Sequence, residues 1–334
     1  MNKLLKIIKN LNLTAFFITL ILPSFILIPV HIFVKPSMLL AERFFPGTWW
    51  LEIVVLTIYA VWLGQVMAKT GNIGNIRVKY WLFFSIIFFG QLILGLTVND
   101  QFLMTGKLHL PIPALIIGVP IYRGGGFFMP ILLLSTMAIA GPGWCSHLCY
   151  IGAWDNWAAR NMKRPKKTIS RKQTIIIRYA MLALVVITAG LMNYFGVSVT
   201  AAAIIAIAFG LFGVFLMLVF SRKLGYMMHC TTYCPIGSIT TLVGKLYPMR
   251  VKIDQDSCTS CGICSTECRY DALTPIDVKS GSAGWNCTLC GDCVSSCHAG
   301  SIRFSFFGSN KNAWIIYIST MISLHAGFLA LARL

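Results

Sequence analysis

Eight cysteines between positions 258 and 297 constrain this chain more than any other feature. They form two runs of one pattern, C-x2-C-x2-C-x3-C, which read C-T-S-C-G-I-C-S-T-E-C and C-T-L-C-G-D-C-V-S-S-C. The second run begins 29 residues after the first, and the repeat continues beyond the cysteines, where Ala272-Leu273 and Ser301-Ile302 are equivalent. Eight thiols at fixed intervals form a regular set of soft ligands, so we expect them to hold metal.

The spacing of these ligands indicates [4Fe–4S] clusters. Zinc ribbons use C-x2-C pairs whose four ligands close a single tetrahedral site. Disulfides belong to oxidising compartments, whereas the charge pattern described below places this stretch in the cytoplasm. In two-cluster bacterial ferredoxins, the fourth cysteine of each run ligates the other cluster. We therefore expect two ligand sets, which are Cys258, Cys261, Cys264 and Cys297 for the first cluster, and Cys287, Cys290, Cys293 and Cys268 for the second.

The composition predicts a membrane protein. The chain has 334 residues, of which 57% are hydrophobic and only 11% charged, and its mean hydropathy is +0.75. An average globular protein has about 25% charged residues. The net charge of +18 could indicate nucleic-acid binding, but Lys and Arg also accumulate in the cytoplasmic loops of polytopic membrane proteins. We expect membrane lipid, and no nucleic acid, as the surroundings of this chain.

Seven apolar segments have the length of a membrane span, which is about 20 residues. The first is too long for the hydrophobic region of a signal peptide, and no small-residue cleavage site follows it, so we expect it to be retained. A further apolar piece at residues 108–122 contains three prolines and is interpreted as an interfacial or re-entrant segment. The spans are predicted at residues 12–33, 49–68, 80–98, 127–144, 174–195, 199–221 and 314–333.

The basic residues predict the orientation of these spans. With the N-terminus inside, only five of the 28 Lys and Arg residues lie outside. If the proline-rich segment also crossed, the basic cluster at residues 160–178 would face outward, against the positive-inside rule. We expect an all-α polytopic protein of the prokaryotic cytoplasmic (inner) membrane, with an inserted α+β ferredoxin module facing the cytoplasm. Its predicted parts are a membrane domain at 1–249, a ferredoxin domain at 250–306 and a C-terminal transmembrane helix at 307–334.

The remaining four cysteines form two C-x3-C units, C-S-H-L-C and C-T-T-Y-C. Each follows directly on a span predicted to run from outside to inside, and the two units lie 85 residues apart. Parallel repeats of this kind occur in membrane proteins. If an axis along the membrane normal relates the units, their thiols converge on one site formed by Cys145, Cys149, Cys230 and Cys234. An amphipathic stretch follows each unit, with Ile151, Trp154 and Trp157 on one face of the first, and Ile236, Ile239, Leu242, Val243 and Leu246 recurring at helical spacing in the second.

Four converging thiolates predict a third iron–sulfur centre, since soft ligands of this number suit such a group. Two separate metal sites, a copper or zinc site, or buried cysteines that pack as small hydrophobes remain alternatives. His147 and His229 lie in or next to the units, and each could ligate metal, bond to a cluster sulfide, accept quinone protons, or simply pack. Electron tunnelling weakens steeply with distance, and the hydrocarbon core is about 30 Å thick. A quinone is therefore expected near these histidines.

Polar residues elsewhere in the spans are weaker candidates. Glu52 is the only acidic residue inside a predicted span, and charged residues in spans are functional candidates by default. It could line a second quinone or proton site at the outer face with His31, Asn99 and Asp100, or simply reach the membrane interface. His325, in the last span, is interpreted as an ordinary polar contact between helices.

The chain resembles the polyferredoxin-type membrane subunits of the NapH/NosR-type quinol dehydrogenase family. The resemblance is carried by G-W-C-S-H-L-C (143–149), H-C-T-T-Y-C-P (229–235) and the eight-cysteine module, and covers roughly residues 75–305. It implies that the chain exchanges electrons between membrane quinone or quinol and a partner redox subunit of a larger oxidoreductase complex, which carries the substrate chemistry. Alternatives are an iron–sulfur maturation factor that reduces a metal or thiol, and a redox sensor.

Two residues depart from the usual ferredoxin pattern. Proline usually follows the last cysteine of each run, but Arg269 and His298 occupy these positions here. Net charge near a cluster helps to set its reduction potential. We therefore expect a cation beside the cluster to raise that potential.

Overall fold

The computed structural model describes residues 11–34, 37–70, 73–103, 110–162, 169–308 and 312–331. Part of the proline-rich segment (108–109), part of the basic cluster (163–168) and the end of the last predicted span (332–333) lie outside the described residues. Contacts divide the chain into two compact units, Met1–His109 with Gly308–Leu334, and Leu110–Phe307. This division differs from the predicted domain boundaries, because it groups three apolar spans with the ferredoxin segment.

Seven of the described helices are long and apolar enough to cross a membrane, by length and composition. This is the number expected from the sequence, and it is typical of a membrane protein. The third span begins before the predicted residue 80, and the fourth continues past the first C-x3-C unit as short helices. The spans are Leu13–Phe33, Trp49–Thr70, Ile73–Thr97, Phe128–Ala159, Arg171–Tyr194, Val199–Leu224 and Ala313–Ala330.

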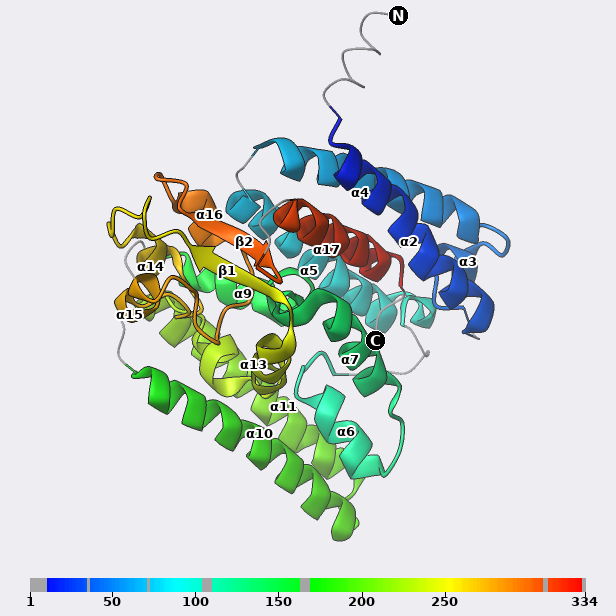
Figure 1. Ribbon diagram of the computed structural model, residues 1–334. Coiled ribbons are helices and arrows are strands. Elements are labelled where there is room, and N and C mark those ends of the chain that lie inside the picture. The colour runs from blue at the N-terminus through cyan, green and yellow to red at the C-terminus, as the bar shows by residue number, and fades with distance from the viewer. Residues whose placement is uncertain are drawn as a thin grey trace, which may run out of the picture. The chain divides into compact units, whose positions relative to one another are not determined.

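The unit that contains both chain ends is a helical bundle built around its last helix. Helix α17 (Ala313–Ala330) packs against α2 (Leu13–Phe33), α4 (Trp49–Thr70) and α5 (Ile73–Thr97), as Figure 1 shows. Two thirds of its span is buried, far more than of any other span. The short helices α3 (Leu40–Phe44) and η1 (Asp100–Phe102) lie in the connections.

The polar residues expected at the outer face of this bundle have structural contacts. Glu52 caps helix α3, because its Oε2 accepts a hydrogen bond from the Ala41 N–H at 2.9 Å. His31 stacks on Trp49 with ring centroids 4.7 Å apart, and Asn99 caps η1 with its side chain. Each of these three side chains therefore has a local contact in the structure, and a shared outer site stays a prediction.

His325 joins three helices of the bundle. Its Nε2 lies 3.1 Å from the carbonyl oxygen of Tyr80, and its Nδ1 lies 3.4 Å from the Tyr59 hydroxyl. The ring is fully buried. Its position agrees with the interpretation of His325 as a polar contact between helices.

The second unit, Leu110–Phe307, begins with a short helix, α6 (Leu115–Arg123). Its nine residues extend about 14 Å at 1.5 Å per residue, which is too short to cross a hydrocarbon core of about 30 Å. It packs along α10, in agreement with a segment that does not span. The helices that follow it are α7 (Phe128–Ala140), η2 (Gly141–Gly143), α8 (Trp144–His147), α9 (Tyr150–Ala159), α10 (Arg171–Tyr194), α11 (Val199–Phe215), η3 (Leu216–Ser221), α12 (Arg222–Leu224), η4 (His229–Tyr233) and α13 (Ile236–Leu246).

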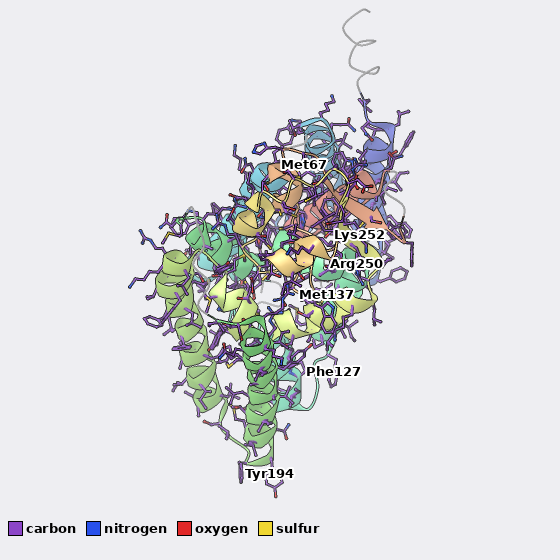
Figure 2. The ribbon with its side chains drawn as sticks, turned by 60° about the vertical axis from the view of Figure 1, so that its left-hand side comes forward. Met67, Phe127, Met137, Tyr194, Arg250 and Lys252 are labelled. Carbon is purple, nitrogen blue, oxygen red and sulfur yellow. The ribbon has the colours of Figure 1, made fainter. Side chains whose placement is uncertain are left out.

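A small α+β segment completes this unit. Strands β1 (Met249–Ile253) and β2 (Ile302–Phe306) pair antiparallel, with Met249 opposite Phe306, and so bring the two ends of the segment together. In Figure 2, Arg250 and Lys252 of β1 lie far from Tyr194 at the tip of α10. Between the strands lie the short helices α14 (Ile263–Glu267), α15 (Pro275–Lys279) and α16 (Asp292–Ser296).

The two cysteine runs fold alike within this segment. Helices α14 and α16 begin 29 residues apart, at equivalent positions of the runs. Left-handed backbone is uncommon for residues other than glycine, yet it recurs here at the same offset. The equivalent left-handed positions are Ser260 and Leu289, Gly262 and Gly291, and Asp271 and Gly300.

Candidate metal centres

The cysteines of the second predicted set line one cavity. Cys268 of the first run lies there with Cys287, Cys290 and Cys293 of the second, which is the crossing of the fourth ligand that the pattern predicts. Burial raises the pKa of Cys268 and of Cys287 to about 12. A thiolate at such a site needs a bound cation to offset its charge, so these residues fit a metal cluster.

The cysteines of the first predicted set lie closer to the solvent. Cys261 is exposed, Cys258 and Cys297 are half-buried, and Cys264 is buried. Helix α14, which contains Cys264, packs against α16, which Cys297 directly follows, so the fourth cysteine of the second run lies near the first run. This set is the more exposed of the two.

Each fourth cysteine receives a hydrogen bond from the equivalent residue four positions later. The Ala272 N–H donates to the sulfur of Cys268 at 3.2 Å, and the Ser301 hydroxyl lies 3.2 Å from the sulfur of Cys297. Burial alone would raise the pKa of Cys297, but hydrogen bonds from Ser301 and nearby backbone hold it below its usual value. Hydrogen bonds to cluster sulfurs are one of the factors that set reduction potential.

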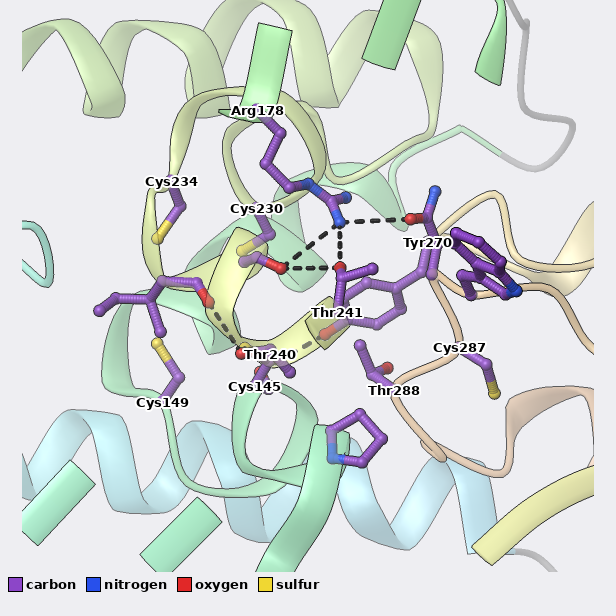
Figure 3. A pocket seen from close by; sticks show the side chains of 15 residues that line it. Cys145, Cys149, Arg178, Cys230, Cys234, Thr240, Thr241, Tyr270, Cys287 and Thr288 are labelled. Carbon is purple, nitrogen blue, oxygen red and sulfur yellow. Dashed lines mark hydrogen bonds between the residues drawn. The ribbon is translucent and has the colours of Figure 1, made fainter. Parts of the chain in front are cut away.

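The two C-x3-C units share a second cavity. Cys145 belongs to α8 and Cys149 directly precedes α9, whereas Cys230 belongs to η4 and Cys234 directly follows it. All four line one cavity, and Figure 3 shows their sulfurs around it. The convergence expected from the 85-residue repeat is therefore present in the fold.

The described thiols are not gathered closely enough for a single ion. A tetrahedral zinc site with Zn–S bonds of about 2.3 Å draws its sulfurs to within about 4 Å of one another. Among the described residues, no three His, Cys, Asp or Glu side chains lie close enough to hold one ion. All twelve cysteines are free of disulfides, and burial raises the pKa of Cys230 and Cys234. Buried thiols spread around a cavity suit an iron–sulfur group.

The middle residues of the first unit bind the second ferredoxin run. The Ser146 hydroxyl donates to the carbonyl of Thr288 at 2.7 Å, and the Nε2 of His147 lies 3.5 Å from the carbonyl of Leu289. Both side chains are fully buried. His147 does not line the cavity, so its role in the structure is to hold the loop that follows Cys287.

His229 also lies outside the lining of the cavity. Its ring packs on Tyr233, with centroids 5.6 Å apart, and a Cβ on Gly213 of α11 would lie 2.8 Å from it. The side chain is buried, and neither ring nitrogen is hydrogen-bonded among the described residues. Of the two histidines, His147 is the one whose ring nitrogen contacts the ferredoxin segment.

Arg178 lines the four-cysteine cavity (Figure 3), whereas the charge pattern predicts for it only a role as a cytoplasmic topology charge. Its Nε donates to the Thr231 carbonyl at 2.7 Å, and its Nη1 to the Thr241 hydroxyl at 2.6 Å and the Asn286 side chain at 3.2 Å. Its position could have identified Arg178 as a candidate from the sequence, because the predicted span 174–195 contains it and charged residues in spans are functional candidates.

Helix α13 turns its polar face toward the cavity. Gly237, Thr240 and Thr241 are buried, and the Thr240 hydroxyl lies 3.1 Å from the sulfur of Cys145. Leu242 and Leu246, from the predicted apolar face, are exposed. The face that lines the cavity is mostly small and polar, and it also includes Ile236 of the predicted apolar face.

Arg269 ties the ferredoxin segment to the helices of the same unit. Its Nη1 donates to the carbonyls of Met162 at 2.9 Å and Gly225 at 3.1 Å, and its own carbonyl accepts from the Met227 N–H at 3.0 Å. The side chain is only 4% exposed. This docking contact explains an arginine where ferredoxins carry proline, while its effect on cluster potential stays a prediction.

Two ion pairs hold the same surfaces together. Arg160 pairs with Asp292 at 2.7 Å, and the two terminal nitrogens of Arg171 donate to the two carboxylate oxygens of Asp277 at 3.0 and 2.8 Å. Burial alone would raise the pKa of Asp277, but hydrogen bonds from Arg171 and Thr274 hold it below its ordinary value. A planar two-bond pair of this kind is stronger than an ordinary surface contact.

Two family models match the regions that contain these sites. One, described as a 4Fe-4S binding domain, matches residues 251–274, which include the first cysteine run. The other, also described as a 4Fe-4S binding domain, matches residues 122–171 and 200–254, which include both C-x3-C units. The chain is also 29% identical over 100 residues to YccM of Escherichia coli (strain K12), a protein provisionally named for electron transport. The chain therefore contains 4Fe–4S binding domains.

The similarity to known proteins is partial. The match to YccM spans 28% of this chain and 28% of YccM. An uncharacterized protein of Methanocaldococcus jannaschii, MJ0749, is 27% identical over 188 residues, which cover 54% of this chain and 71% of that protein. No solved structure matches the chain.

The substitution Asp277→Asn removes the charge from the pair with Arg171. We expect it to lower the free energy of unfolding by about 1 kcal/mol at neutral pH, the lower end of the range for charged hydrogen bonds, because Arg171 is partly exposed. The folded-state pKa of Asp277 is lowered, so the wild type has this stabilisation above the ordinary aspartate pKa and loses it as the pH falls below about 4. Denaturant titrations in detergent at both pH values measure the difference.

The control is Asp256→Asn, which neutralises an exposed carboxylate of the same segment and should leave stability unchanged. Equal stability of the two variants at neutral pH would show that the Arg171–Asp277 pair contributes nothing.

Proposed function

We propose that this protein relays electrons between the membrane quinone pool and a partner redox subunit. The path consists of two [4Fe–4S] clusters in the ferredoxin segment and a third iron–sulfur centre at the two C-x3-C units. One observation carries this proposal. Cys287, a ligand of the second predicted cluster, also lines the cavity of the four C-x3-C cysteines. The two cavities are therefore neighbours, which short electron steps require.

The exposure of the cysteines supports an order for the three sites. The C-x3-C cavity and the second set are largely buried, whereas Cys261 of the first set is exposed. Bound clusters would supply one-electron carriers at each site. The exposed segment around Cys261 is the natural place for a partner redox subunit, and the second set then connects it to the C-x3-C cavity.

The quinone is proposed to bind on the membrane side of the C-x3-C cavity. The seven apolar helices and the resemblance of the C-x3-C motifs to quinol dehydrogenase subunits support a quinone as the membrane partner. His147 is engaged with the Leu289 carbonyl. His229, next to Cys230 and packed on span helix α11, is therefore the favoured neighbour of the quinone.

Replacing Cys145 or Cys230 with Ser tests the shared third centre. We expect each variant to lose the same EPR signal, since both thiols line one cavity, and to fall from about 12 to about 8 iron atoms per chain. Anaerobic EPR with iron quantitation gives both readings. Cys261→Ser is the matched control, which should lose a ferredoxin signal and keep that of the third centre. Two unrelated losses, or about 8 iron atoms in the wild type, would reject the shared centre.

Quinol should reduce the purified protein if the relay proposal is correct. We expect a reduced quinol, added anaerobically to the protein in detergent, to produce the EPR signals of reduced clusters, because electrons enter at the membrane end. Dithionite serves as the control that every cluster can be reduced. A protein that dithionite reduces and quinol does not, but that reduces Cu(II), would support the maturation-factor alternative instead.

The orientation proposed for the membrane is N-terminus inside, with the ferredoxin segment in the cytoplasm of a prokaryotic cell, and it rests on the distribution of basic residues. A reporter fused after Leu334 should then be active on the outer side, because seven spans separate it from the N-terminus. A fusion between residues 163 and 168 provides the cytoplasmic control. Cytoplasmic activity of the Leu334 fusion would overturn the orientation.

A further inference from the structure

Arg178 is a buried cation for which the described residues supply no anion. It is 4% exposed and lies in α10, a helix long and apolar enough to span a membrane. A buried charge is costly unless a group of opposite charge offsets it. Burial of Arg178 therefore calls for a negatively charged group near its guanidinium.

The hydrogen-bond partners of Arg178 are all neutral. Its Nε binds the carbonyl of Thr231, and its Nη1 binds the side chains of Thr241 and Asn286 and reaches the carbonyl of Gly237 at 3.5 Å. Within the described part of the chain it forms no ion pair, and Nη2 has no acceptor. These bonds fix the direction of the guanidinium and leave its charge without a partner.

Other arginines of the same unit are paired. Arg171, two turns earlier on α10, binds Asp277, and Arg160 binds Asp292. Asp155, the acidic residue beside the second C-x3-C unit, accepts from the Cys230 N–H at 2.9 Å, does not line the cavity and is not bonded to Arg178. Carboxylates therefore offset the charges of Arg160 and Arg171, and none is bonded to Arg178 among the described residues.

The groups that remain are the thiols of the cavity. Arg178 lines it together with all four C-x3-C cysteines, and it interacts electrostatically with Cys145, Cys230 and Cys234. Four thiolates around an iron–sulfur cubane carry a net negative charge, which buried surroundings do not screen. Arginine stays protonated under all ordinary conditions.

We propose that Arg178 is the charge partner of the iron–sulfur centre held by the four C-x3-C cysteines, and that it raises the reduction potential of that centre. This inference rests on the proposed function, which places the centre in this cavity. Reduction adds one electron to the centre, with no bond made or broken and no proton taken up. Because the added charge is negative, a fixed cation stabilises the reduced form more than the oxidised form.

Three variants separate the charge of Arg178 from its hydrogen bonds. Arg178→Gln removes the charge and keeps a donor, Arg178→Lys keeps the charge, and Arg171→Gln removes a charge from the same helix away from the cavity. Each purified protein is analysed for iron and titrated with dithionite under anaerobic conditions, with EPR detection of every cluster. This measures a potential and a metal content rather than activity.

At the ambient potential where the wild-type third centre is half reduced, we expect Arg178→Gln to lower the ratio of reduced to oxidised centre about tenfold or more. The two ferredoxin signals should not move, and both Arg178→Lys and Arg171→Gln should match the wild type. Loss of the third centre in Arg178→Gln alone, with about 8 iron atoms against about 12 in Arg178→Lys, would also support the charge role.

An Arg178→Gln protein with full iron and an unchanged third potential would overturn the inference while leaving the relay intact. Equal shifts in Arg178→Gln and Arg178→Lys would overturn it as well, because the hydrogen bonds and not the charge would then matter. About 8 iron atoms in the wild type would instead remove the third centre itself, so failure of the proposed function is visible before any variant is compared.

Discussion

The arrangement of the metal sites depends on one contact, between the first C-x3-C unit and the loop that follows Cys287. Ser146 and His147 bind two successive backbone carbonyls of that loop, and both side chains are fully buried. A buried carbonyl that loses its donor costs about 1–3 kcal/mol, so these bonds strongly favour one position of the loop. The place of Cys287 between two cavities is thus set by a motif 140 residues earlier in the chain as well as by the ferredoxin fold.

Several basic residues of this unit that the sequence pattern predicts only as topology charges also make specific contacts in the structure. The run from Arg160 to Arg178 reads as a topology signal, because Lys and Arg accumulate on the cytoplasmic side. In the structure, Arg160 and Arg171 also bind carboxylates of the ferredoxin segment, and Arg178 turns into the cavity. Residues that the sequence pattern predicts to be topology charges therefore also hold the ferredoxin segment on the helices.

The sequence predicted the parts of the site whose chemistry is encoded locally. The spacing of cysteines along a short run limits which thiols can share a metal site, so both ferredoxin sets could be predicted from the pattern. The 85-residue repeat likewise predicts that Cys145 and Cys230 share a site. The partners of His147 and Arg178 could not be predicted from the sequence. Leu289 and Asn286 lie more than a hundred residues away along the chain, and only tertiary packing brings them close.

The pairing of β1 with β2 closes the ferredoxin segment at its two ends and gives it the outline of a self-contained insert. The insert is not self-contained, however. The carbonyls of Thr288 and Leu289 and the side chain of Asn286 have their hydrogen-bond partners in residues outside it. Exchange of this segment between related chains would separate acceptors from their donors. A chimera that receives a foreign insert would keep these bonds only if residues 146, 147 and 178 supply donors that match it.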